Sequence, residues 1–500
     1  MKMLLSAVLS GCSVVHTRGE VNLEVSGITL DSRTVAPGFV FVAIRGLKTD
    51  GNRFVPQAIA RGAAAIVSVL PGEGYPGTTW IQVADERAAL AALAANFNGR
   101  PAEKLHAIGI TGTNGKTTTS CVVEAILHSA GFPCAVFGTI EYRGPGFRLT
   151  AERTTPEAPE LQALFKRVVD GGWKYAVMEV SSHAIELKRV EGLRFEVGVF
   201  TNLTRDHLDL HNDMRSYFLA KKKLFTGLDR TVPRVLVLNR DDPHFDELKA
   251  IAPSRVVSYG LNLAADICPT RHAPAADLKG MDVAYKSPLG ELQMQTGLIG
   301  KPNLYNIGAA IGVAVGFGLS AEATRQGVAQ LQNVPGRFEL VQAEQAFRVV
   351  VDYAHTDDAL ARLLETAREI TPGHVFVVFG CGGDRDRTKR PLMGEVAARA
   401  SDFAVATSDN PRGEDPMAIL RDVEPGLQRA GGVEGKTYRM IPDRREAIRF
   451  VLKLARPGDT VLLAGKGHET YQIIGNEALP FDDRAVAREL LDELATGRNR

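Results

Sequence analysis

A glycine-rich turn followed by a helix constrains this chain more than any other feature of its sequence. The turn spans residues 109–118, with the sequence GITGTNGKTT, and residues 120–127 after it have helical spacing. Glycines let backbone N–H groups approach phosphate oxygens, and the N-terminus of a helix attracts anions. Because an apolar stretch precedes the turn, the pattern predicts a phosphate-binding loop between a strand and a helix.

Side chains of the same turn complete the predicted site. We expect Lys116 to reach the outer phosphates of ATP and Thr117 to bind Mg²⁺ through its hydroxyl. The usual loop has glycine where this chain has Ile110, a departure that points to a particular subgroup. A merely structural turn is the alternative. The residues expected to surround the nucleotide phosphates are Gly112, Thr113, Asn114, Gly115, Lys116, Thr117 and Thr118.

Composition narrows the classes of partner. Lys and Arg total 59 against 58 Asp and Glu, and this balance argues against nucleic acid and against a basic membrane-binding surface. We therefore expect small-molecule substrates. The five cysteines are scattered without Cys-x-x-Cys spacing, which indicates a reducing compartment and neither a zinc site nor a disulfide framework. No apolar run reaches transmembrane length.

The N-terminal segment resembles a short export signal that ends in Leu9-Ser10-Gly11-Cys12. Its single positive charge and short apolar stretch favour a first amphipathic helix instead, with export as the alternative. The expected location is the cytoplasm, where ATP is available.

Apolar strands alternate with helices along the chain, which predicts an α/β protein of three domains. Residues 1–102 are expected to form a small α/β domain. Residues 103–335 carry the phosphate loop and should form a mostly parallel sheet, followed by hairpins within residues 266–298. Residues 336–500 should form a second, doubly wound domain of the Rossmann type.

Polar residues follow two further strands of the middle domain. Glu179 ends the apolar stretch 175–178, at the edge where a phosphate-loop domain holds its metal ligands, and His183 follows closely. Residues 201–209 crowd more polar groups after the next strand. A histidine that satisfies loop backbone and a solvated loop are the alternatives. We expect Glu179 and His183 to bind Mg²⁺.

Together these motifs resemble the Mur ligase family, and the resemblance covers nearly the whole chain. It implies an ATP-dependent amide ligase of peptidoglycan precursor synthesis. More closely, the C-terminal motifs resemble members that join meso-2,6-diaminopimelate to UDP-MurNAc-L-Ala-D-Glu through an acyl phosphate. The motifs that carry the resemblance are residues 112–117, 178–183, 206–207, 380–386, 389–391, 409–412 and 465–469.

The resemblance also assigns contacts by position. It implies that the first domain binds the UDP-precursor, the middle domain ATP and the C-terminal domain the amino acid. The residues implied near the nucleotide are Asn303, Asn306, Arg337, Asp352 and His355. Those implied to contact the UDP-precursor are Leu30, Ser32, Thr154, Thr155, Ser181 and Arg189. Those implied to contact diaminopimelate are Arg390, Asp409, Asn410, Pro411, Arg412, Gly465 and Glu469.

The implied chemistry brings anions together, so the catalyst must neutralise charge. The implied catalytic residues are Lys116, His183 and Lys221, and the implied metal ligands are Thr117, Glu179, His183 and Lys221. Lys221 begins a run of three lysines and is implied to carry a carbamate, an oxygen ligand suited to Mg²⁺. Without the resemblance, the run is typical of a solvated helix face.

Two positions depart from the family pattern. Leu187 stands where relatives often carry a polar residue, and the turn around Leu47 lacks a histidine seen in some relatives. Both concern affinity for the UDP-precursor. The alternative functions are a lysine-adding ligase of the same family, a folate polyglutamate ligase and a non-catalytic nucleotide-binding regulatory protein. We expect a monomer.

Overall fold

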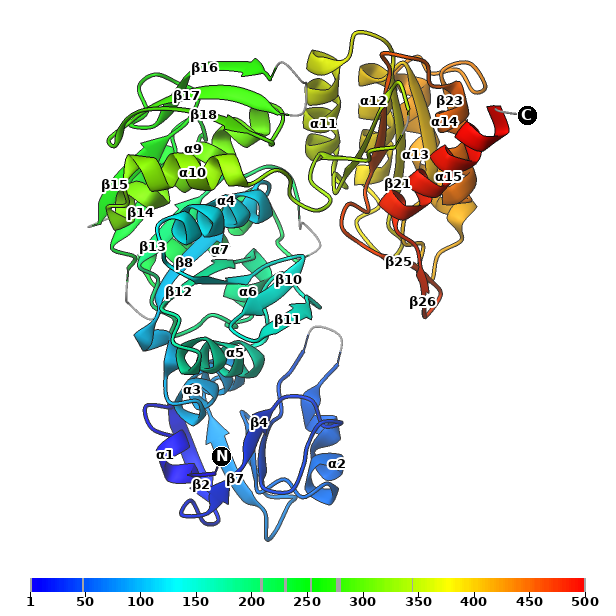
Figure 1. Cartoon of the computed structure of the whole chain (residues 1–500). Coiled ribbons are helices and arrows are strands. Elements are labelled where there is room, and N and C mark those ends of the chain that lie inside the picture. Colours follow the sequence, from blue (N-terminus) through cyan, green and yellow to red (C-terminus); the bar gives the residue numbers. More distant parts are fainter. Residues whose placement is uncertain are drawn as a thin grey trace.

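In the described part of the chain, three large sheets organise the molecule, each built from one consecutive stretch of sequence (Figure 1). The computed structural model describes residues 2–46, 49–206, 210–228, 232–251, 254–275, 280–343 and 345–498. Each large sheet is mostly parallel and is accompanied by helices, so the predicted three-domain α/β fold is confirmed. The predicted boundaries after residues 102 and 335 stay a prediction.

The first domain is built on a sheet with the strand order β2-β7-β6-β5-β4. Only β2 runs antiparallel, against β7. The strands are β2 (Val14–Arg18), β4 (Gly27–Thr29), β5 (Phe39–Val42), β6 (Ala65–Ser68) and β7 (Thr79–Val83). The helices are α1 (Leu5–Val8), α2 (Val55–Ala60) and α3 (Glu86–Phe97).

The predicted N-terminal helix is a single turn. α1 follows β1 (Met3–Leu4), which pairs with β3 (Glu24–Val25). Leu5 and Val8 are fully buried in the core of the first domain. The apolar residues at the start of the chain are therefore explained by this core.

The middle domain has a sheet with the strand order β11-β10-β9-β12-β8-β13-β14-β15, parallel except for β10 and β11. Its strands are β8 (His106–Thr111), β9 (Cys134–Phe137), β10 (Glu141–Gly144), β11 (Phe147–Thr150), β12 (Tyr175–Glu179), β13 (Val197–Phe200), β14 (Val235–Asn239) and β15 (Arg255–Tyr259). Its helices are α4 (Lys116–Ser129), α5 (Ala158–Asp170), α6 (Ser182–Glu186), α7 (Met214–Thr226), α8 (Phe245–Ala250), α9 (Lys301–Phe317) and α10 (Ala321–Gln330). The predicted hairpins are β16 (Cys268–Pro274), β17 (Met281–Ser287) and β18 (Gly290–Thr296), which form an antiparallel sheet.

The position of β8 explains where the predicted site lies. β8 pairs with β12 on one side and β13 on the other, so the turn after it opens at the middle of the sheet edge. Ile108 and Ile110 pack into the core cluster that contains residues of α4 and α9, whereas Ala107 packs into the cluster on the other face. Because both faces are buried, the strand is apolar from Ala107 to Ile110.

The C-terminal domain has the strand order β19-β20-β24-β21-β22-β23, with β19 antiparallel. Its strands are β19 (Glu339–Leu340), β20 (Arg348–Asp352), β21 (Val375–Cys381), β22 (Phe403–Ser408), β23 (Tyr438–Met440) and β24 (Thr460–Ala464). Its helices are α11 (Asp357–Ile370), α12 (Lys389–Ala400), α13 (Pro416–Arg429), α14 (Arg444–Leu454) and α15 (Asp483–Arg498). A separate hairpin, β25 (Tyr471–Ile474) with β26 (Glu477–Pro480), projects from this domain (Figure 1).

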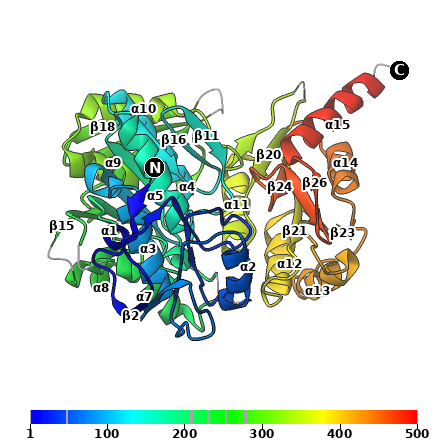
Figure 2. The ribbon, with the colours of Figure 1, turned by 90° about the horizontal axis from the view of Figure 1, so that it is seen from below.

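Of the helices in the C-terminal domain, α11 lies toward the middle domain in both ribbon views (Figures 1 and 2). At its start, Asp358 accepts a hydrogen bond from Asn114 Nδ2 of the phosphate loop at 2.9 Å. Arg205 of the middle domain donates to Thr388 Oγ1 at 2.7 Å. Within the described ranges, no helix combines the length and apolar character needed to cross a bilayer.

Candidate active site

The turn after β8 has the shape of a phosphate-binding loop. α4 begins at Lys116, so its N-terminus faces the turn. Gly112 and Gly115 have φ angles of +149° and +87°. A Cβ at Gly112 would collide with Thr201 Oγ1, and a Cβ at Gly115 would collide with Asn306 Oδ1. Both conformation and space therefore require glycine at these two positions.

Lys116 folds back over this loop. Its Nζ donates to the carbonyl oxygens of Gly112 and Thr113, at 2.8 Å each. Burial lowers the pKa of Lys116, while the charge of Glu179 acts in the opposite direction. The amine therefore lies within the loop that is expected to surround phosphate.

Glu179 gathers hydroxyl groups at the end of β12, where it is almost fully buried. Its carboxylate accepts from Thr117 Oγ1 at 3.1 Å, and from the backbone N–H and the hydroxyl of Thr139 at 2.9 and 2.8 Å. Arg337 reaches over from the C-terminal domain and donates to Thr117 Oγ1 at 3.0 Å. A carboxylate beside a threonine hydroxyl is a donor pair that suits Mg²⁺.

Lys221 is buried beneath the same loop and does not lie on a solvated face. Only 1% of the residue is exposed, and Nζ donates to Gly112 O at 2.9 Å. The amine also lies 4.4 Å from the centre of the Tyr217 ring. Burial, followed by the charge of Lys116, holds the pKa of Lys221 well below its usual value. This environment therefore disfavours the charged form of the amine relative to water.

His183 lies half-buried in α6, which packs against α7, the helix that carries Lys221. Its ring centre is 6.2 Å from that of His211, and the His211 ring centre is 5.0 Å from that of Tyr217. These rings connect His183 to the phenol beneath Lys221. Among the described residues no group of three or more His, Cys, Asp and Glu side chains has the geometry of a metal site.

A cavity of about 410 Å³ opens between the phosphate loop and the C-terminal domain. Asn303 and Asn306 line it from α9, and Asn306 Nδ2 donates to Asn303 Oδ1 at 2.9 Å. Arg337, Asp352 and His355 line it from the C-terminal side. Burial raises the pKa of Asp352 and lowers that of His355. Every residue predicted near the nucleotide, apart from Gly112, lines this cavity.

A second cavity, of about 770 Å³, adjoins the first. The two share the wall residues Thr139, Thr154, Asp206, Tyr353 and His355. The second cavity is also lined by these predicted site residues: His183, Asp409, Asn410, Arg412, Gly465 and Glu469. Our assignment missed Arg385, which lines this cavity. Its place just after β21, at the same sheet edge as the turn after β22, is the signal that could have found it.

The turn after β22 carries most of the predicted amino-acid contacts. Asn410 Nδ2 donates to Glu469 Oε2 at 2.9 Å, and Lys466 Nζ lies 3.3 Å from the same oxygen. Asp409 Oδ1 is buried and accepts no hydrogen bond from the described residues, with Lys466 Nζ 3.6 Å away. Burial and the neighbouring Asp409 raise the pKa of Glu469. Arg412 donates to Gly383 O at 2.9 Å. The turn thus places acidic oxygens and a guanidinium in one cavity.

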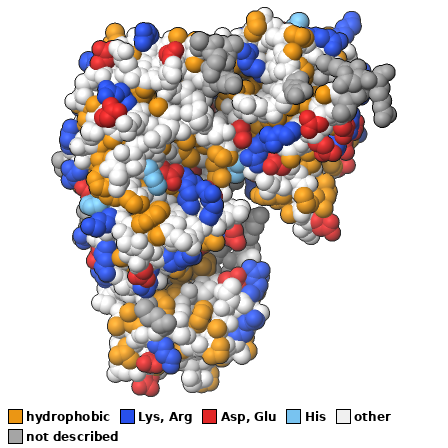
Figure 3. All heavy atoms as spheres, in the orientation of Figure 1, with side chains coloured by type: hydrophobic (Ala, Val, Ile, Leu, Met, Phe, Trp, Pro, Cys, Tyr) orange, Lys and Arg blue, Asp and Glu red, His pale blue; other side chains and the backbone are white. Residues whose placement is uncertain are grey.

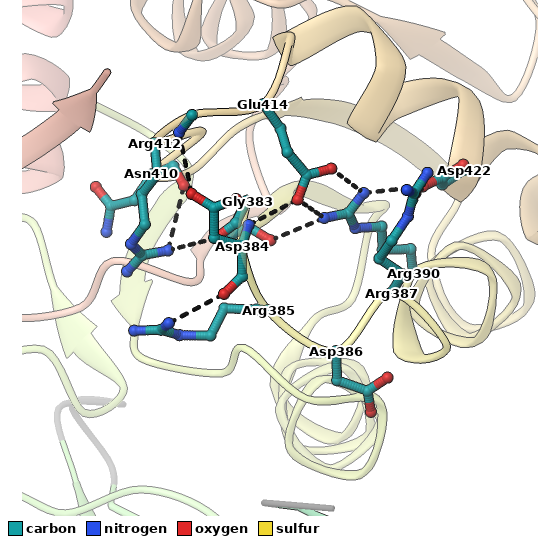
Figure 4. A network of polar contacts seen from close by, with 12 residues as sticks. Gly383, Asp384, Arg385, Asp386, Arg387, Arg390, Asn410, Arg412, Glu414 and Asp422 are labelled. Carbon is teal, nitrogen blue, oxygen red and sulfur yellow. Dashed lines mark hydrogen bonds and ion pairs between the residues drawn. The ribbon is translucent and has the colours of Figure 1, made fainter. Parts of the chain in front are cut away.

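Arg390 lies outside this cavity, contrary to its predicted contact with substrate. Its side chain is 0% exposed and pairs with Glu414 and Asp422 at 2.7 and 2.8 Å (Figure 4). It lies in the first turn of α12, and both partners come from the chain around α13. In this arrangement a substrate carboxylate could reach Arg390 only if these ion pairs broke.

Three residues predicted to contact the UDP-precursor cluster beside Glu179. Thr155 Oγ1 donates to the Glu179 carbonyl at 2.8 Å, and Ser181 N donates to Thr155 Oγ1 at 3.2 Å. Arg189 donates to Thr155 O at 3.2 Å and pairs with Glu157 at 2.8 Å. These contacts place the three side chains beside the end of β12.

Two further predicted contacts lie in the first domain, whereas Thr154 lies in the wall that the two cavities share. Leu30 and Ser32 are in the first domain and line neither cavity, and Ser32 Oγ donates to Gln57 at 2.8 Å. The carbonyl of Leu187 accepts from Arg87 of the first domain at 3.2 Å. Lys and Arg side chains gather near the junction of the first and middle domains (Figure 3). Leu47 and residues 207–209 lie outside the described residues.

Comparisons with known proteins agree with this arrangement. Three family models match the chain: "Mur ligase family, catalytic domain" at residues 24–98, "Mur ligase middle domain" at 110–314, and "Mur ligase, glutamate ligase domain" at 336–467.

Relatives match over almost the full length. A protein of Solibacter usitatus is 49% identical, with 94% of each chain covered, and one of Geobacter metallireducens is 46% identical, with 96% of each covered. Both are named UDP-N-acetylmuramoyl-L-alanyl-D-glutamate–2,6-diaminopimelate ligase. A solved structure of a ligase with that name is 33% identical, covers 99% of this chain and 100% of its own, and has a TM-score of 0.69. The chain therefore belongs to the Mur ligase family.

Proposed function

We propose that this protein is an ATP-dependent amide ligase that joins meso-2,6-diaminopimelate to UDP-MurNAc-L-Ala-D-Glu, with release of ADP and phosphate. The relatives that carry this name, at 49% and 46% identity, support the assignment. The observation that carries it is the union of two cavities. One is lined by a phosphate loop and the other by the turn with Asp409 and Arg412, and they share a wall.

The shared wall suits a reaction in two steps. In the first, a carboxylate of the UDP-precursor attacks the γ-phosphorus of ATP, which gives an acyl phosphate and ADP. In the second, the amine of the amino acid attacks the acyl carbon, loses a proton and expels phosphate as the amide forms. Both steps bring anions together, so aligned positive charge lowers both barriers. Lys116 supplies that charge at the phosphates, from within the loop.

Mg²⁺, when bound, would neutralise phosphate charge beside Glu179. Thr117, Glu179, His183 and a carbamylated Lys221 are the residues we assign to hold it. Two observations support the carbamate: Lys221 is buried beside the loop, and this burial shifts its pKa downward. Only the neutral amine attacks carbon dioxide, with loss of one proton. The new group would put carboxylate oxygens beside the loop, where the lysine now donates to Gly112 O.

The second cavity provides the basis for choosing the amino acid. A carboxylate at the far end of the substrate needs a planar, charged partner, and Arg412 offers a guanidinium there. Asp409 Oδ1, which accepts no hydrogen bond from the described residues, and Glu469 are suited to receive ammonium groups, with Asn410 holding Glu469 in place. Lysine has no second carboxylate and would leave Arg412 without a carboxylate partner.

The first domain is assigned to the UDP-precursor, with Leu30 and Ser32 as contacts, and Thr154, Thr155, Ser181 and Arg189 on the middle domain. We propose domain boundaries after residues 102 and 335, and a monomer that acts without nucleic acid or membrane insertion.

An amino-acid panel tests the proposal. The full chain is incubated with UDP-MurNAc-L-Ala-D-Glu, ATP, Mg²⁺ and one amino acid at a time, while phosphate release and product mass are measured. We expect turnover with meso-diaminopimelate and little with lysine. Preferred turnover of lysine would assign the lysine-adding activity. In a parallel incubation in which folate replaces the UDP-precursor and glutamate is the amino acid, turnover would assign the folate ligase. No turnover with any of these substrates would support a non-catalytic nucleotide-binding protein.

A further inference from the structure

Two turns of the C-terminal domain hold each other through backbone groups (Figure 4). We call residues 382–385, after β21, the β21 turn, and residues 409–414, after β22, the β22 turn. Gly383 N donates to Asn410 O at 2.9 Å, and Arg412 Nη1 donates back to Gly383 O at 2.9 Å. The same Nη1 also lies 3.4 Å from Asn410 O of its own turn. The shorter bond, to the carbonyl of the β21 turn, therefore helps to set the direction of the Arg412 guanidinium.

Arg390 anchors the β21 turn on both sides of that carbonyl. Its Nη2 donates to Gly382 O at 3.3 Å, and its guanidinium makes two hydrogen bonds to the Glu414 carboxylate, at 2.7 and 2.9 Å. Glu414 Oε1 in turn accepts from Asp384 N at 2.6 Å. Along the chain, the Gly383 carbonyl thus lies between Gly382 O, which Arg390 holds directly, and Asp384 N, which it holds through Glu414.

Both turns need such anchoring because each contains a residue in the left-handed region. Asp384 has a φ of +53° and Arg412 a φ of +52°, although neither is glycine. Residues with side chains keep this conformation only where the surrounding contacts enforce it. Asp384 Oδ2 accepts from Gly413 N at 3.1 Å, which ties the two left-handed positions together.

We propose that Arg390 is a positioning residue for the amino-acid substrate. It touches no substrate atom and acts through Gly382 and Glu414 on the carbonyl that aims Arg412. This role replaces the direct contact expected from the sequence, and it rests on the proposed function. A bidentate contact depends on alignment, so a small displacement of the guanidinium weakens it strongly.

Steady-state kinetics of Arg390→Met in the full chain test the proposal. We expect the KM for meso-diaminopimelate to rise about 10-fold through misplacement of Arg412. The KM values for ATP and the UDP-precursor should stay within about twofold, since their contacts lie elsewhere. The ratio of kcat/KM for diaminopimelate over lysine should fall as the KM for diaminopimelate rises, because lysine makes no contact with Arg412. Arg390→Lys should recover part of the loss, since one ammonium cannot hold Gly382 O and both acids in the same geometry.

Glu414→Gln is the second variant, in case Arg390→Met fails to fold. Its amide oxygen can still receive Asp384 N, but the charge pair with Arg390 is lost, so we expect a smaller shift in the same direction. Arg387→Met is the matched control. Arg387 lies on the same segment and pairs with Asp422 at 2.9 Å, yet its side chain is 65% exposed and reaches neither turn. Its kinetics should equal those of the wild type.

The outcomes separate the two levels of inference. A wild type that does not incorporate diaminopimelate overturns the proposed function and this role together. If the wild type does incorporate it, unchanged KM and discrimination in folded Arg390→Met, or in Glu414→Gln if Arg390→Met does not fold, overturn the positioning role alone. An equal loss of kcat with all amino acids, at constant discrimination, overturns it as well, because that result indicates mere support of the fold.

Discussion

Replacing Arg412 with alanine should weaken binding of diaminopimelate and leave the other substrates almost unaffected. The guanidinium lines the second cavity, where Asp409 and Glu469 are the neighbouring acids. A carboxylate that lost its charge-assisted partner beside these acids would bind about 2–4 kcal/mol more weakly, which corresponds to roughly 30- to 1000-fold in KM. The hydrogen bond to Gly383 O is lost in free and bound enzyme alike, so it lowers stability but cancels from the KM.

Alanine is the appropriate replacement because it leaves the backbone strain at position 412 unchanged. Arg412 has a φ of +52°, and alanine meets the same steric cost there, whereas glycine would relax it. Phosphate release is measured with diaminopimelate varied at saturating ATP and UDP-precursor. Arg429→Ala is the control, since it removes the same charge from an arginine that is 52% exposed at the end of α13. A normal KM for diaminopimelate in folded Arg412→Ala would refute the assignment of Arg412, and Arg412→Lys should recover only part of the affinity.

Three further predictions follow from the same contacts. Lys116→Ala should lower kcat at least about 100-fold at an unchanged melting temperature, because the glycines and α4 shape the loop while Lys116 supplies charge; near-normal phosphate release would contradict this. Lys221→Ala should be almost inactive and partly restored by small carboxylic acids that replace the carbamate, so full activity of the untreated variant would refute the role. The hydrogen bond from Arg390 lowers the pKa of Glu414 from 4.5 to about 2. A carboxyl group with a depressed pKa stabilises the fold above its unfolded pKa and loses that contribution as the pH falls toward the folded value. The melting temperature of Glu414→Gln should therefore fall less than that of the wild type between about pH 5 and pH 3, and parallel melting curves would count against the ion pair.

Apolar runs predicted the strands well and their ends less well. The sequence of residues 134–140 is typical of one buried strand, but β9 ends at Phe137 and Thr139 N donates to the Glu179 carboxylate. Such errors arise because residues at the carboxyl ends of parallel strands leave the ladder to form site loops. Local composition does not reveal where pairing stops, since pairing depends on partners distant in the sequence.

Lys221 shows a site signal that the sequence does contain. Tyr217 and Leu224, at helical spacing from it, are both buried, so the period of α7 places Lys221 on the apolar face. Lys222 and Lys223 fall outside that face and pair with acidic residues. Composition alone treats the three lysines as equal, whereas periodicity separates them.

For Arg390 and Arg385, in contrast, the local sequence does not fully predict where the side chains lie. Both lie in the segment that resembles the family. The place of Arg385 just after β21 indicates the edge of the cavity, but neither charge nor spacing shows that Arg390 is turned away from it. Arg390 is sequestered by Glu414 and Asp422, which are 24 and 32 residues away along the chain. The direction of this side chain is decided by the packing of α12 against α13, which no local pattern encodes.

The hairpin of β25 and β26 holds the backbone at position 412 without using the side chain of that residue. Arg412 N donates to Ile473 O at 3.0 Å, and Gly475 N donates to Arg412 O at 2.7 Å. The hairpin thus hydrogen-bonds both backbone groups of Arg412, and neither hydrogen bond involves the Arg412 side chain. A library of variants at residues 412 and 469 can therefore place new side chains on an unchanged backbone. Shortening the hairpin would instead displace the backbone at position 412 in every variant of the library. Ligases for other diamino acids can be sought by substituting residues 412 and 469 while the hairpin of β25 and β26 is kept unchanged.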